Sequence, residues 1–288
     1  MANQYIDKIL QRINENTNTT TNVGIIIASP SESPPYKYHW IRDSALVMRT
    51  IVDMYRTTKD PVYFQSILNY IEIESRLQGL ETISGLGEPK YNINCTAFNG
   101  SWGRPQNDGP ALRGIILFQI IELFSYKYET IVKQLILPII IKDLNYLLGN
   151  YRKVSFDIWE EKKGWHFYTR MVQAKFLKEA LRFKKLFGDE MNTELVTNAY
   201  QGLLSDLNDH INGETIISSF DEKGKIIKYE DAANLLAFCH INYDEEILKT
   251  IPLEFVNHTC DGLIQAFRKK YKDDEMNLIG RYIDDKYY

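Results

Sequence analysis

The sequence predicts an all-α protein made of paired helices. Apolar residues recur every three to four positions along most of the 288 residues, whereas the alternating pattern of strands is rare. Loops separate the periodic segments, so the order is helix, loop, helix throughout. The hydrophobic content of 44% and the charged content of 25% are ordinary for a globular protein, and the length is sufficient for a substantial core.

Each expected helix has an apolar face, and several carry start or stop signals. Asp60 precedes Pro61, an order that is favoured at a helix start. Asp43 is placed to cap the segment SALVMRTIVDMYRT, and Pro138 predicts a kink in a later helix. Helices are expected at residues 4–14, 44–57, 60–78, 108–127, 128–148, 166–187, 190–208, 230–239 and 261–271. Strands are expected at residues 24–29 and 215–220.

Charge and hydropathy argue against nucleic-acid and membrane partners. The formal net charge is −4 and the basic clusters are short, whereas nucleic-acid affinity comes mostly from grouped Lys and Arg on phosphates. The longest apolar run, residues 135–141, is too short to span a membrane. The first 22 residues lack a basic region followed by an apolar run, so we expect a cytoplasmic protein without a signal peptide.

The cysteines and histidines predict neither a disulfide framework nor a metal site. Cys95, Cys239 and Cys260 are an odd set without paired spacing. The five histidines show no HExxH or similar ligand spacing, so we interpret them as structural. Cys95 has no base close to it in sequence, so a nucleophilic role is not expected.

Two long aromatic loops are the strongest functional signal. They are SPSESPPYKYHWIRD, residues 29–43, and GLGEPKYNINCTAFNGSWGRPQND, residues 85–108. Both combine Trp or Tyr with Arg and Asp, on a helical frame where loops tend to carry binding residues. Aromatic faces stack on the apolar side of a sugar ring, and charged groups bond its hydroxyls about twice as strongly as neutral groups do. The loops therefore indicate a carbohydrate site.

A pair of adjacent acids, Glu160 and Glu161, follows Trp159 in the stretch FDIWEE. One interpretation is that they are exposed acids at the start of a helix, where the helix dipole favours negative charge. The other is that they are a functional pair. Composition alone favours the first interpretation, because acidic side chains are mostly exposed. Trp40 and Trp102 likewise suit either a core or a binding site, and Arg42 with Asp43 suits either an ion pair or sugar binding.

The blocks taken together resemble the glucoamylase family, glycoside hydrolase family fifteen. In order, the matching blocks are GIIIASPS, YHWIRDSALV, GLGEPKYN, GSWGRPQNDGPALR and FDIWEE. The match covers about residues 23–172 and is weaker from residue 215, where YEDAANLLAFCHI and LIGRYIDDKYY are similar to two further family blocks. The resemblance implies an (α/α)6 barrel of six outer and six inner helices. Residues 1–288 would then be a single glucoamylase-like catalytic domain, the N-terminal two-thirds of the family domain.

The resemblance also implies an activity and a set of site residues. The family releases glucose from the non-reducing ends of α-1,4-glucans or malto-oligosaccharides, with inversion and without a metal or organic cofactor. Glu160 matches the general acid, and Glu161 matches a residue that binds sugar hydroxyls. Arg42 and Asp43 would hold the terminal glucose. The wall of the pocket and its further polar contacts would come from Tyr36, Trp40, Trp102 and Arg104.

The chemistry of glycosidic cleavage suits these roles, because it needs a carboxylic acid that stays protonated near neutral pH. Trp159 and Phe156 are placed to bury Glu160. Glu161 and Asp157 add negative charge nearby, and both effects raise the pKa of a carboxyl group. Neighbours on a helix point about 100° apart, so the two glutamates would have divided tasks.

The chain departs from the family pattern in its last third. An inverting enzyme needs a second carboxylate as base, roughly 6.5–9.5 Å from the acid, and the family carries it in a block that would lie after Tyr288. We therefore expect an incomplete barrel whose open edge is covered by self-association or a partner chain. Ile227 or Lys228 stands where many relatives have an Arg.

Three hypotheses remain open from the sequence, and the first is the one that the resemblance leads us to predict. The chain is a hydrolase whose base comes from a second chain or from another acid, or it is a catalytically dead or weak α-glucan-binding relative, or it is a fragment of a longer hydrolase. The acids considered for the base are Glu230, Asp231, Asp284 and Asp285.

Overall fold

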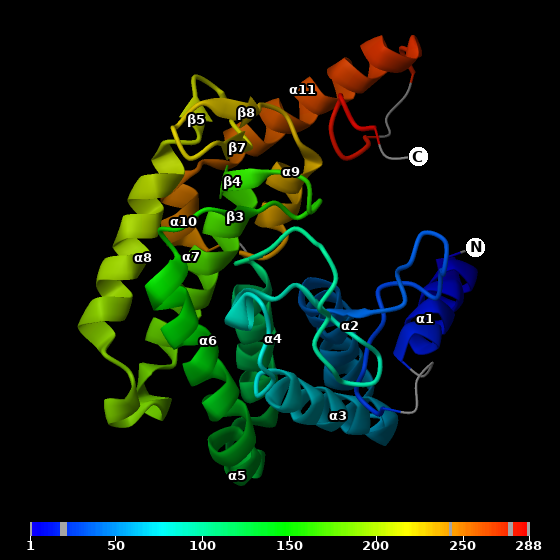
Figure 1. Ribbon diagram of the computed structural model, residues 1–288, viewed down its shortest axis with the longest axis vertical. Coiled ribbons are helices and arrows are strands. Elements are labelled where there is room, and N and C mark those ends of the chain that lie inside the picture. The colour runs from blue at the N-terminus through cyan, green and yellow to red at the C-terminus, as the bar shows by residue number, and fades with distance from the viewer. Residues whose placement is uncertain (1, 18–21, 242–243, 276–278, 287–288) are drawn as a thin grey trace. The chain divides into compact units, whose positions relative to one another are not determined.

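The computed structural model describes residues 2–17, 22–241, 244–275 and 279–286 and is mostly helical, which confirms the all-α expectation (Figure 1). Its contacts form two compact units that alternate along the sequence. Unit 1 comprises Met1–Pro105, Gly109–Leu147 and Lys185–Met191. Unit 2 comprises Gln106–Asp108, Leu148–Lys184 and Asn192–Tyr288. A single domain over residues 1–288 stays a prediction.

Unit 1 is built around α2 (Ile41–Thr58), which packs against α3 (Pro61–Leu77) and α4 (Gly109–Phe124). α4 is apolar on every side and almost wholly buried, as expected for a helix at the centre of a core. Two short strands, β1 (His39–Trp40) and β2 (Lys90–Tyr91), pair antiparallel with Trp40 opposite Lys90. The remaining elements are α1 (Ala2–Thr17), η1 (Gly85–Gly87), η2 (Ser125–Tyr128), α5 (Glu129–Ile131), η3 (Val132–Ile136) and η5 (Gly188–Glu190). Most of α6 (Leu137–Asn150) and of η4 (Lys184–Leu186) also belongs to unit 1.

The predicted cap of α2 is wrong. The helix begins at Ile41, and Trp40 occupies the N-cap position in an extended conformation without a side-chain cap bond. Pairing of β1 with β2 keeps the chain extended as far as Trp40, so the helix starts directly after the strand. Asp43 therefore lies inside the first turn, where its charge still interacts favourably with the helix dipole.

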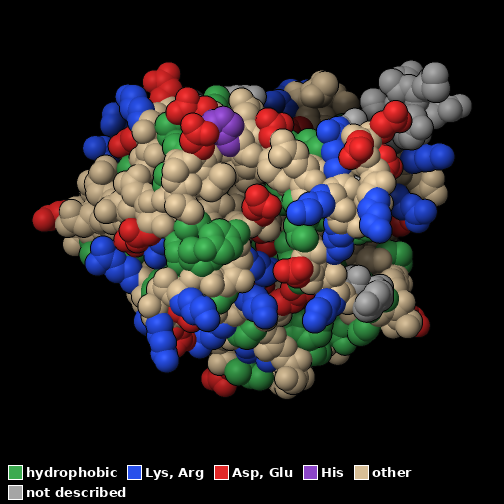
Figure 2. All heavy atoms as spheres, turned by 90° about the horizontal axis from the view of Figure 1, so that it is seen from above, with side chains coloured by type: hydrophobic (Ala, Val, Ile, Leu, Met, Phe, Trp, Pro, Cys, Tyr) green, Lys and Arg blue, Asp and Glu red, His purple; other side chains and the backbone are tan. Residues whose placement is uncertain are grey.

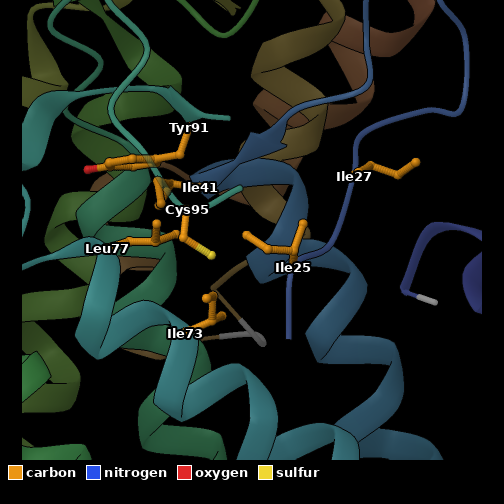
Figure 3. Close-up of a cluster of buried hydrophobic side chains, with 7 residues drawn as sticks. All are labelled: Ile25, Ile27, Ile41, Ile73, Leu77, Tyr91 and Cys95. Atoms are coloured by element: carbon orange, nitrogen blue, oxygen red, sulfur yellow. The ribbon is translucent and has the colours of Figure 1, made fainter. Parts of the chain in front are cut away.

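The predicted strand at residues 24–29 is also wrong. Its backbone amides donate to scattered acceptors instead of a neighbouring strand; Ile27 N bonds to Asn16 O, and Ala28 N bonds to Tyr38 O. Ile25 and Ile27 are fully buried and belong to an apolar cluster beside α3 (Figure 3). The other buried members are Ile41, Ile73, Leu77, Tyr91 and Cys95. A short apolar run marks burial, and here it marks a buried loop.

The start of α3 follows the prediction. Asp60 is the N-cap, and its Oδ1 accepts a 2.9 Å hydrogen bond from Val62 N, with Pro61 at the first helical position. We expect Asp60→Ala to lower the free energy of unfolding by about 1 kcal/mol, because the amide loses its acceptor. Asp60→Asn keeps an equivalent acceptor and should be nearly neutral. Urea unfolding of both variants checks this, and equal losses would contradict it.

The interruption predicted at Pro138 takes the form of a π-helical turn. This turn, η3, ends one residue before α6 begins at Leu137. Proline has no amide hydrogen, and its ring clashes with the carbonyl four residues earlier in a regular helix. The wider turn is a known way for a helix to accommodate such a break.

Unit 2 combines five helices with a small antiparallel sheet. α7 (Phe167–Arg182) packs against α8 (Thr193–Asn208) and α9 (Ala232–Phe238). The sheet has the order β3 (Ser155–Phe156), β4 (Lys163–His166), β7 (Ser219–Phe220) and β8 (Ile226–Lys228). The remaining elements are the hairpin β5 (Ile211–Asn212) and β6 (Thr215–Ile216), with α10 (Glu245–Thr250) and α11 (Leu253–Tyr271). The strand expected at 215–220 is thus two separate strands, and α10 was not expected.

The surface carries charges of both signs. On the face drawn in Figure 2, acidic and basic side chains are interspersed, with hydrophobic groups between them. No helix among the described residues is both long enough and apolar enough to cross a bilayer.

Candidate functional site

The FDIWEE stretch forms a tight turn in unit 2, between β3 and β4, and does not begin a helix. Asp157 organises this turn. Its backbone carbonyl accepts a 2.9 Å bond from Glu160 N, and its Oδ1 accepts bonds of 2.8 and 3.1 Å from the amides of Glu161 and Lys162. The interpretation of the two glutamates as acids at a helix start is therefore wrong, and so is their helical spacing of about 100°.

Glu160 has a strained backbone and a fixed carboxyl group. Its φ is 65°, which is uncommon for a residue with a long side chain and costs free energy. Its Oε1 accepts a 2.8 Å bond from Nε2 of Gln106, a residue that is 2% exposed. The Asp157 side chain supports the turn that imposes this conformation. Strain of this kind is found mostly at functional sites.

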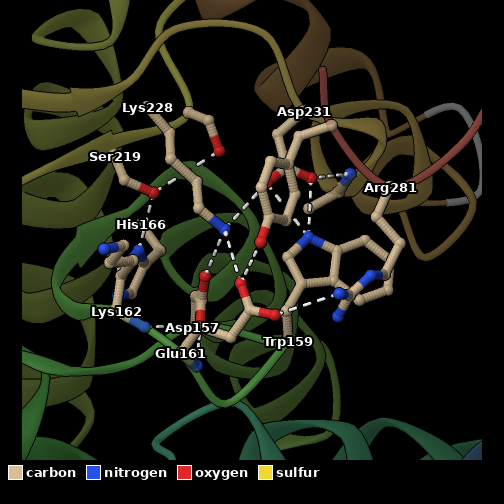
Figure 4. Close-up of polar contacts among 12 residues, drawn as sticks. Asp157, Trp159, Glu161, Lys162, His166, Ser219, Lys228, Asp231 and Arg281 are labelled. Atoms are coloured by element: carbon tan, nitrogen blue, oxygen red, sulfur yellow. Dashed lines mark hydrogen bonds and ion pairs between the residues drawn. The ribbon is translucent and has the colours of Figure 1, made fainter. Parts of the chain in front are cut away.

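Glu161 binds the segment near the C-terminal end of the described chain (Figure 4). Arg281 Nη2 donates to its Oε1 at 3.0 Å, and the Tyr282 hydroxyl donates to its Oε2. Lys228 Nζ lies 3.9 Å from the same Oε2. Arg281 is itself held by Asp285, and this bond raises the pKa of the guanidinium above its ordinary value. The bond between Glu161 and Arg281 thus links two residues that are 120 positions apart in sequence.

Lys228 is the buried cation on the other side of Glu161 from Arg281. Its Nζ lies 2.7 Å from Asp157 Oδ2 and 3.4 Å from Asp231 Oδ2 (Figure 4). Burial alone would raise the pKa of Asp157, but the charge and hydrogen bond of Lys228 outweigh it and hold that pKa below its ordinary value. Of the two positions considered for a basic residue, Lys228 and not Ile227 therefore faces the acids.

Asp231 has a structural role at the start of α9. Its carboxylate accepts bonds of 2.8 and 3.0 Å from Trp159 Nε1, and its Oδ1 accepts a 2.8 Å bond from Ala233 N. Burial raises its pKa. Asp285 is likewise engaged through both oxygens by Arg281. Neither acid presents a carboxylate that is suited to activate water.

His166 stands behind the turn as a neutral residue. Burial lowers its pKa. Its Nε2 lies 2.9 Å from the Ser155 carbonyl, which can only accept, so Nε2 carries the proton. Nδ1 then accepts a 2.8 Å bond from the Ser219 hydroxyl. The histidine fastens β4 to β3 and β7, in line with the structural role expected for it.

A cavity of about 970 Å³ opens beside this cluster within unit 2. Among its lining residues are Glu161, Lys228, Glu230, Tyr282 and Asp284. Glu161 is partly exposed here, which gives a ligand access to its carboxylate.

The aromatic candidates meet in unit 1. The Trp40 ring centroid lies 5.9 Å from that of Tyr36 and 6.0 Å from that of Trp102, both in tilted or edge-on arrangements. Such arrangements are the favoured geometry of aromatic pairs. Trp40 is 3% exposed, whereas Tyr36 and Trp102 are half-buried. The two aromatic loops thus lie side by side at this point.

The other candidates in unit 1 divide into two groups. Arg42 and Asp43 occupy the first turn of α2, and both are half-buried. The guanidinium of Arg104 is hydrogen-bonded to other residues of the protein. It forms bonds of 2.7–3.0 Å to the buried Glu88 carboxylate, with further bonds to the carbonyls of Gly100 and Phe98. Its contacts therefore stabilise the loop that contains it.

Comparison with known proteins supports the resemblance that the sequence blocks indicated. The family model of glycosyl hydrolases family 15 matches residues 3–288. The chain belongs to this family. It is 38% identical to the glucoamylase of Blastobotrys adeninivorans over 72% of the chain, and 32% identical to glucoamylase-1 of Arthroderma benhamiae over 93%. It covers only 34% and 46% of those two relatives.

A solved family 15 structure has the same fold. The glucoamylase of Saccharomycopsis fibuligera matches 99% of the chain with a TM-score of 0.87 at 27% identity, and the chain covers 68% of that structure. The likeness confirms the (α/α)6 barrel class expected from the sequence.

Several residues that contact the candidate residues in the structure were given no role from the sequence. Gln106 and Lys90 lie in quoted blocks but received no role. Lys228 was noted only as a departure from the family pattern, and Arg281 and Tyr282 only as part of the block LIGRYIDDKYY. Their position inside otherwise matching blocks was the available signal. Leu278, Tyr287 and Tyr288 of the last block lie outside the described residues.

The pair of Asp157 and Lys228 predicts a pH-dependent stability. We expect Asp157→Asn to lower the free energy of unfolding by about 1–3 kcal/mol at pH 7, since it removes a charged hydrogen bond but keeps an acceptor for the turn. The folded-state pKa of Asp157 lies below the ordinary 3.8. The stabilisation is therefore present above about pH 4 and is lost as pH falls through the folded-state pKa.

Urea unfolding of wild type and Asp157→Asn at pH 7 and pH 3 measures this difference. Asp261→Asn, an exposed change on α11, is the matched control and should have little effect at either pH. A difference that stays constant across the two pH values would rule out the ionised Asp157 as its source.

Proposed function

We propose that this family 15 chain is a glucoamylase-like glycoside hydrolase that acts on the non-reducing ends of α-1,4-glucans or malto-oligosaccharides, with Glu160 as general acid. The observation that carries the proposal is the conformation of Glu160. A half-buried glutamate is held at positive φ in a turn that Asp157 and Lys228 stabilise. Among the described residues, Lys59, Cys95 and Lys272 share this conformation, and Glu160 is the one that carries a carboxyl group. Backbone strain at a group able to donate a proton supports a reacting role.

The hydrogen bond from Gln106 suggests how the acid works. An amide N–H on Oε1 holds the carboxyl group in place, and the proposed acid role requires this group to carry a proton. In the reaction, that proton passes to the glycosidic oxygen as its bond to the anomeric carbon breaks. A water molecule attacks the opposite face of the sugar, and a base about 6.5–9.5 Å from the acid takes its proton. Configuration at the anomeric carbon is then inverted.

The remaining candidates suit the binding of a sugar. Tyr36, Trp40 and Trp102 offer aromatic faces, and Arg42 and Asp43 offer polar groups for the terminal glucose. The indole N–H of Trp102 is buried and has no acceptor among the described residues. An unsatisfied donor of this kind costs free energy that a sugar hydroxyl would recover. Glu161 would accept hydroxyl hydrogen bonds at the edge of the unit 2 cavity.

The alternative function is α-glucan binding without turnover. It is favoured by the engagement of Asp231 and Asp285, whose oxygens are bound by Trp159, Ala233 and Arg281. A chain without a general base would then bind a glucose end and cleave it slowly. Self-association and a cytoplasmic location also stay predictions.

Glucose release from maltose and maltotriose by the purified chain separates the two functions. The hydrolase proposal expects release of glucose whose first-formed anomer is β, measured by NMR. Maltose binding in a calorimeter without release would favour the binding protein. Light scattering in the same buffer reports self-association. A chain that neither binds nor cleaves malto-oligosaccharides would overturn both.

A further inference from the structure

Lys90 is a buried cation to which the function above gives no role. It lies on β2 within the block GLGEPKYN, is 1% exposed, and pairs across the two strands with Trp40. Burying a lysine ammonium is costly, whereas a methionine of similar length would fill the same space at little cost. A lysine at this position therefore suggests a task that needs its charge.

The charge lies at the centre of four aromatic rings. Lys90 Nζ is 3.2 Å from the centroid of the Trp102 ring and 4.3 Å from that of Phe98. The centroids of Tyr38 and Trp40 are each 4.5 Å away. All four lie within the roughly 6 Å range of cation–π attraction, which is strongest for Trp and grows when the cation is desolvated.

The four rings come from the two aromatic loops. Tyr38 and Trp40 precede α2, while Phe98 and Trp102 belong to the loop before α4. The rings also contact one another, with centroids 5.3 Å apart for Tyr38 and Phe98 and 6.0 Å apart for Trp40 and Trp102. Lys90 is thus a common partner that ties one loop to the other.

The same block fastens the second loop at another point. Glu88, two residues before Lys90, is 1% exposed and binds the Arg104 guanidinium through both oxygens. Phe98 and Arg104 bracket the segment that contains Trp102, so the block holds this segment by an ion pair at one end and by cation–π contacts along it. Block GLGEPKYN is therefore the support of the Trp102 loop.

We propose that Lys90 is a positioning residue that fixes the indole rings of Trp40 and Trp102 for sugar binding. The proposal rests on the function given above, because it assigns these rings to the sugar pocket. Lys90 acts through them and needs no contact with the sugar. Loss of its charge should make both rings more mobile. Sugar binding would then have to order them, which makes the free energy of binding less favourable.

Lys90→Met tests the charge at nearly constant volume. We expect a folded protein by far-ultraviolet circular dichroism, an altered tryptophan emission spectrum, and an affinity for maltose that falls roughly tenfold, the scale of one lost desolvated cation–π contact. Lys90→Arg keeps the charge and should recover part of the affinity. Lys127→Met removes an exposed lysine 5.2 Å from the Tyr128 ring and should change neither quantity.

The outcomes separate this proposal from the function beneath it. Maltose affinity within twofold of wild type and an unchanged emission spectrum in Lys90→Met would overturn the positioning role. If wild type binds no malto-oligosaccharide, the proposed function fails, and an altered emission spectrum in Lys90→Met still supports the ring contacts. If Lys90→Met does not fold, Tyr38→Leu replaces it, because it removes one ring of the four. Its affinity should fall severalfold, and an unchanged affinity would count against Lys90.

Discussion

Glu160→Gln is expected to lower the rate of glucose release from maltotriose by about 10²–10⁴-fold, the usual contribution of a general acid. Glutamine is isosteric with glutamate and keeps an oxygen that can accept the hydrogen bond from Gln106. It has no proton of suitable acidity for the glycosidic oxygen. The fold and the maltose affinity should therefore remain, and the loss should appear in kcat.

Glu161→Gln is the matched control, since it changes the neighbouring acid by the same substitution. This residue binds Arg281 and Tyr282 and would bind sugar hydroxyls, so we expect KM to rise more than kcat falls. Steady-state kinetics on maltose and maltotriose distinguish the two variants. Equal effects on kcat from both substitutions would contradict a divided role for the pair.

Glu160→Gly tests whether the strained backbone at residue 160 serves the reaction or the stability of the turn. Glycine adopts positive φ without the roughly 1–2 kcal/mol that other residues lose there, so the variant should be at least as stable as wild type to urea. It should also be inactive. A clear loss of stability would mean that the carboxyl group mainly holds the turn, and the acid role would lose its main support. If the wild-type chain is itself inactive, we expect Glu160→Gln and Glu160→Gly to bind maltose as tightly as wild type does.

Local patterns were enough to predict most of the helices. α3 was predicted with its cap and its proline because both signals act within four residues of chain. α10 was missed because six residues are too few to show a helical period. The strand at 24–29 and the cap at Asp43 failed for the opposite reason. Their outcome depends on partners elsewhere in the chain, namely β2 for Trp40 and several unrelated acceptors for residues 25–28.

The residues of the candidate site could be predicted from the sequence, but the hydrogen bonds and ion pairs that hold them could not. Family blocks indicated Glu160, Glu161 and the aromatic loops. The turn that holds the glutamates depends on Lys228, which is 71 residues from Asp157, and on Arg281, which is 120 residues from Glu161. No periodicity or spacing reports contacts of that range. The burial of Lys90 could not be predicted for the same reason. A lysine is usually exposed, and the sequence does not show that four aromatic rings surround this one.

The polar core of unit 1 predicts the largest effect on stability. Arg113 on α4 is 1% exposed and binds Asp143 on α6 through two bonds of 2.8 and 2.5 Å. It also binds Glu74 on α3 at 2.9 Å. Burial pushes the pKa of Glu74 up, but hydrogen bonds from His39 and Arg113, together with the charge of Arg113, outweigh it and keep that pKa below its ordinary value. Burial raises the pKa of Asp143.

His39 contributes a hydrogen bond to this network. Its Nδ1 accepts a 3.0 Å bond from the backbone amide of Ile26, so Nδ1 carries no proton. Nε2 therefore donates to Glu74 Oε1, at 3.0 Å. With His39 neutral, Arg113 is the cation that lies between two buried carboxylates. The arginine thus joins three helices of unit 1 by charge.

Arg113→Met should lower the free energy of unfolding by about 3–5 kcal/mol at pH 7, the usual cost of removing one partner of a buried ion pair. The cost arises from the acids left behind, so pH should change it. Without the cation, burial raises the pKa values of Glu74 and Asp143 in the folded state. Stability is then retained at low pH, where both are protonated, and lost as pH rises. Urea unfolding at pH 4.5 and pH 8 should show this slope.

The triple variant Arg113→Met, Glu74→Gln, Asp143→Asn tests whether the charges or the packing set the cost. It removes every charge of the trio while keeping the side chains close to their original volumes. Replacing a whole buried ionic group with neutral residues is often nearly neutral for stability. We therefore expect the triple variant to recover much of the loss and to unfold with little dependence on pH. If it is as unstable as Arg113→Met at both pH values, the bidentate geometry of the arginine, and not its charge, holds the three helices together.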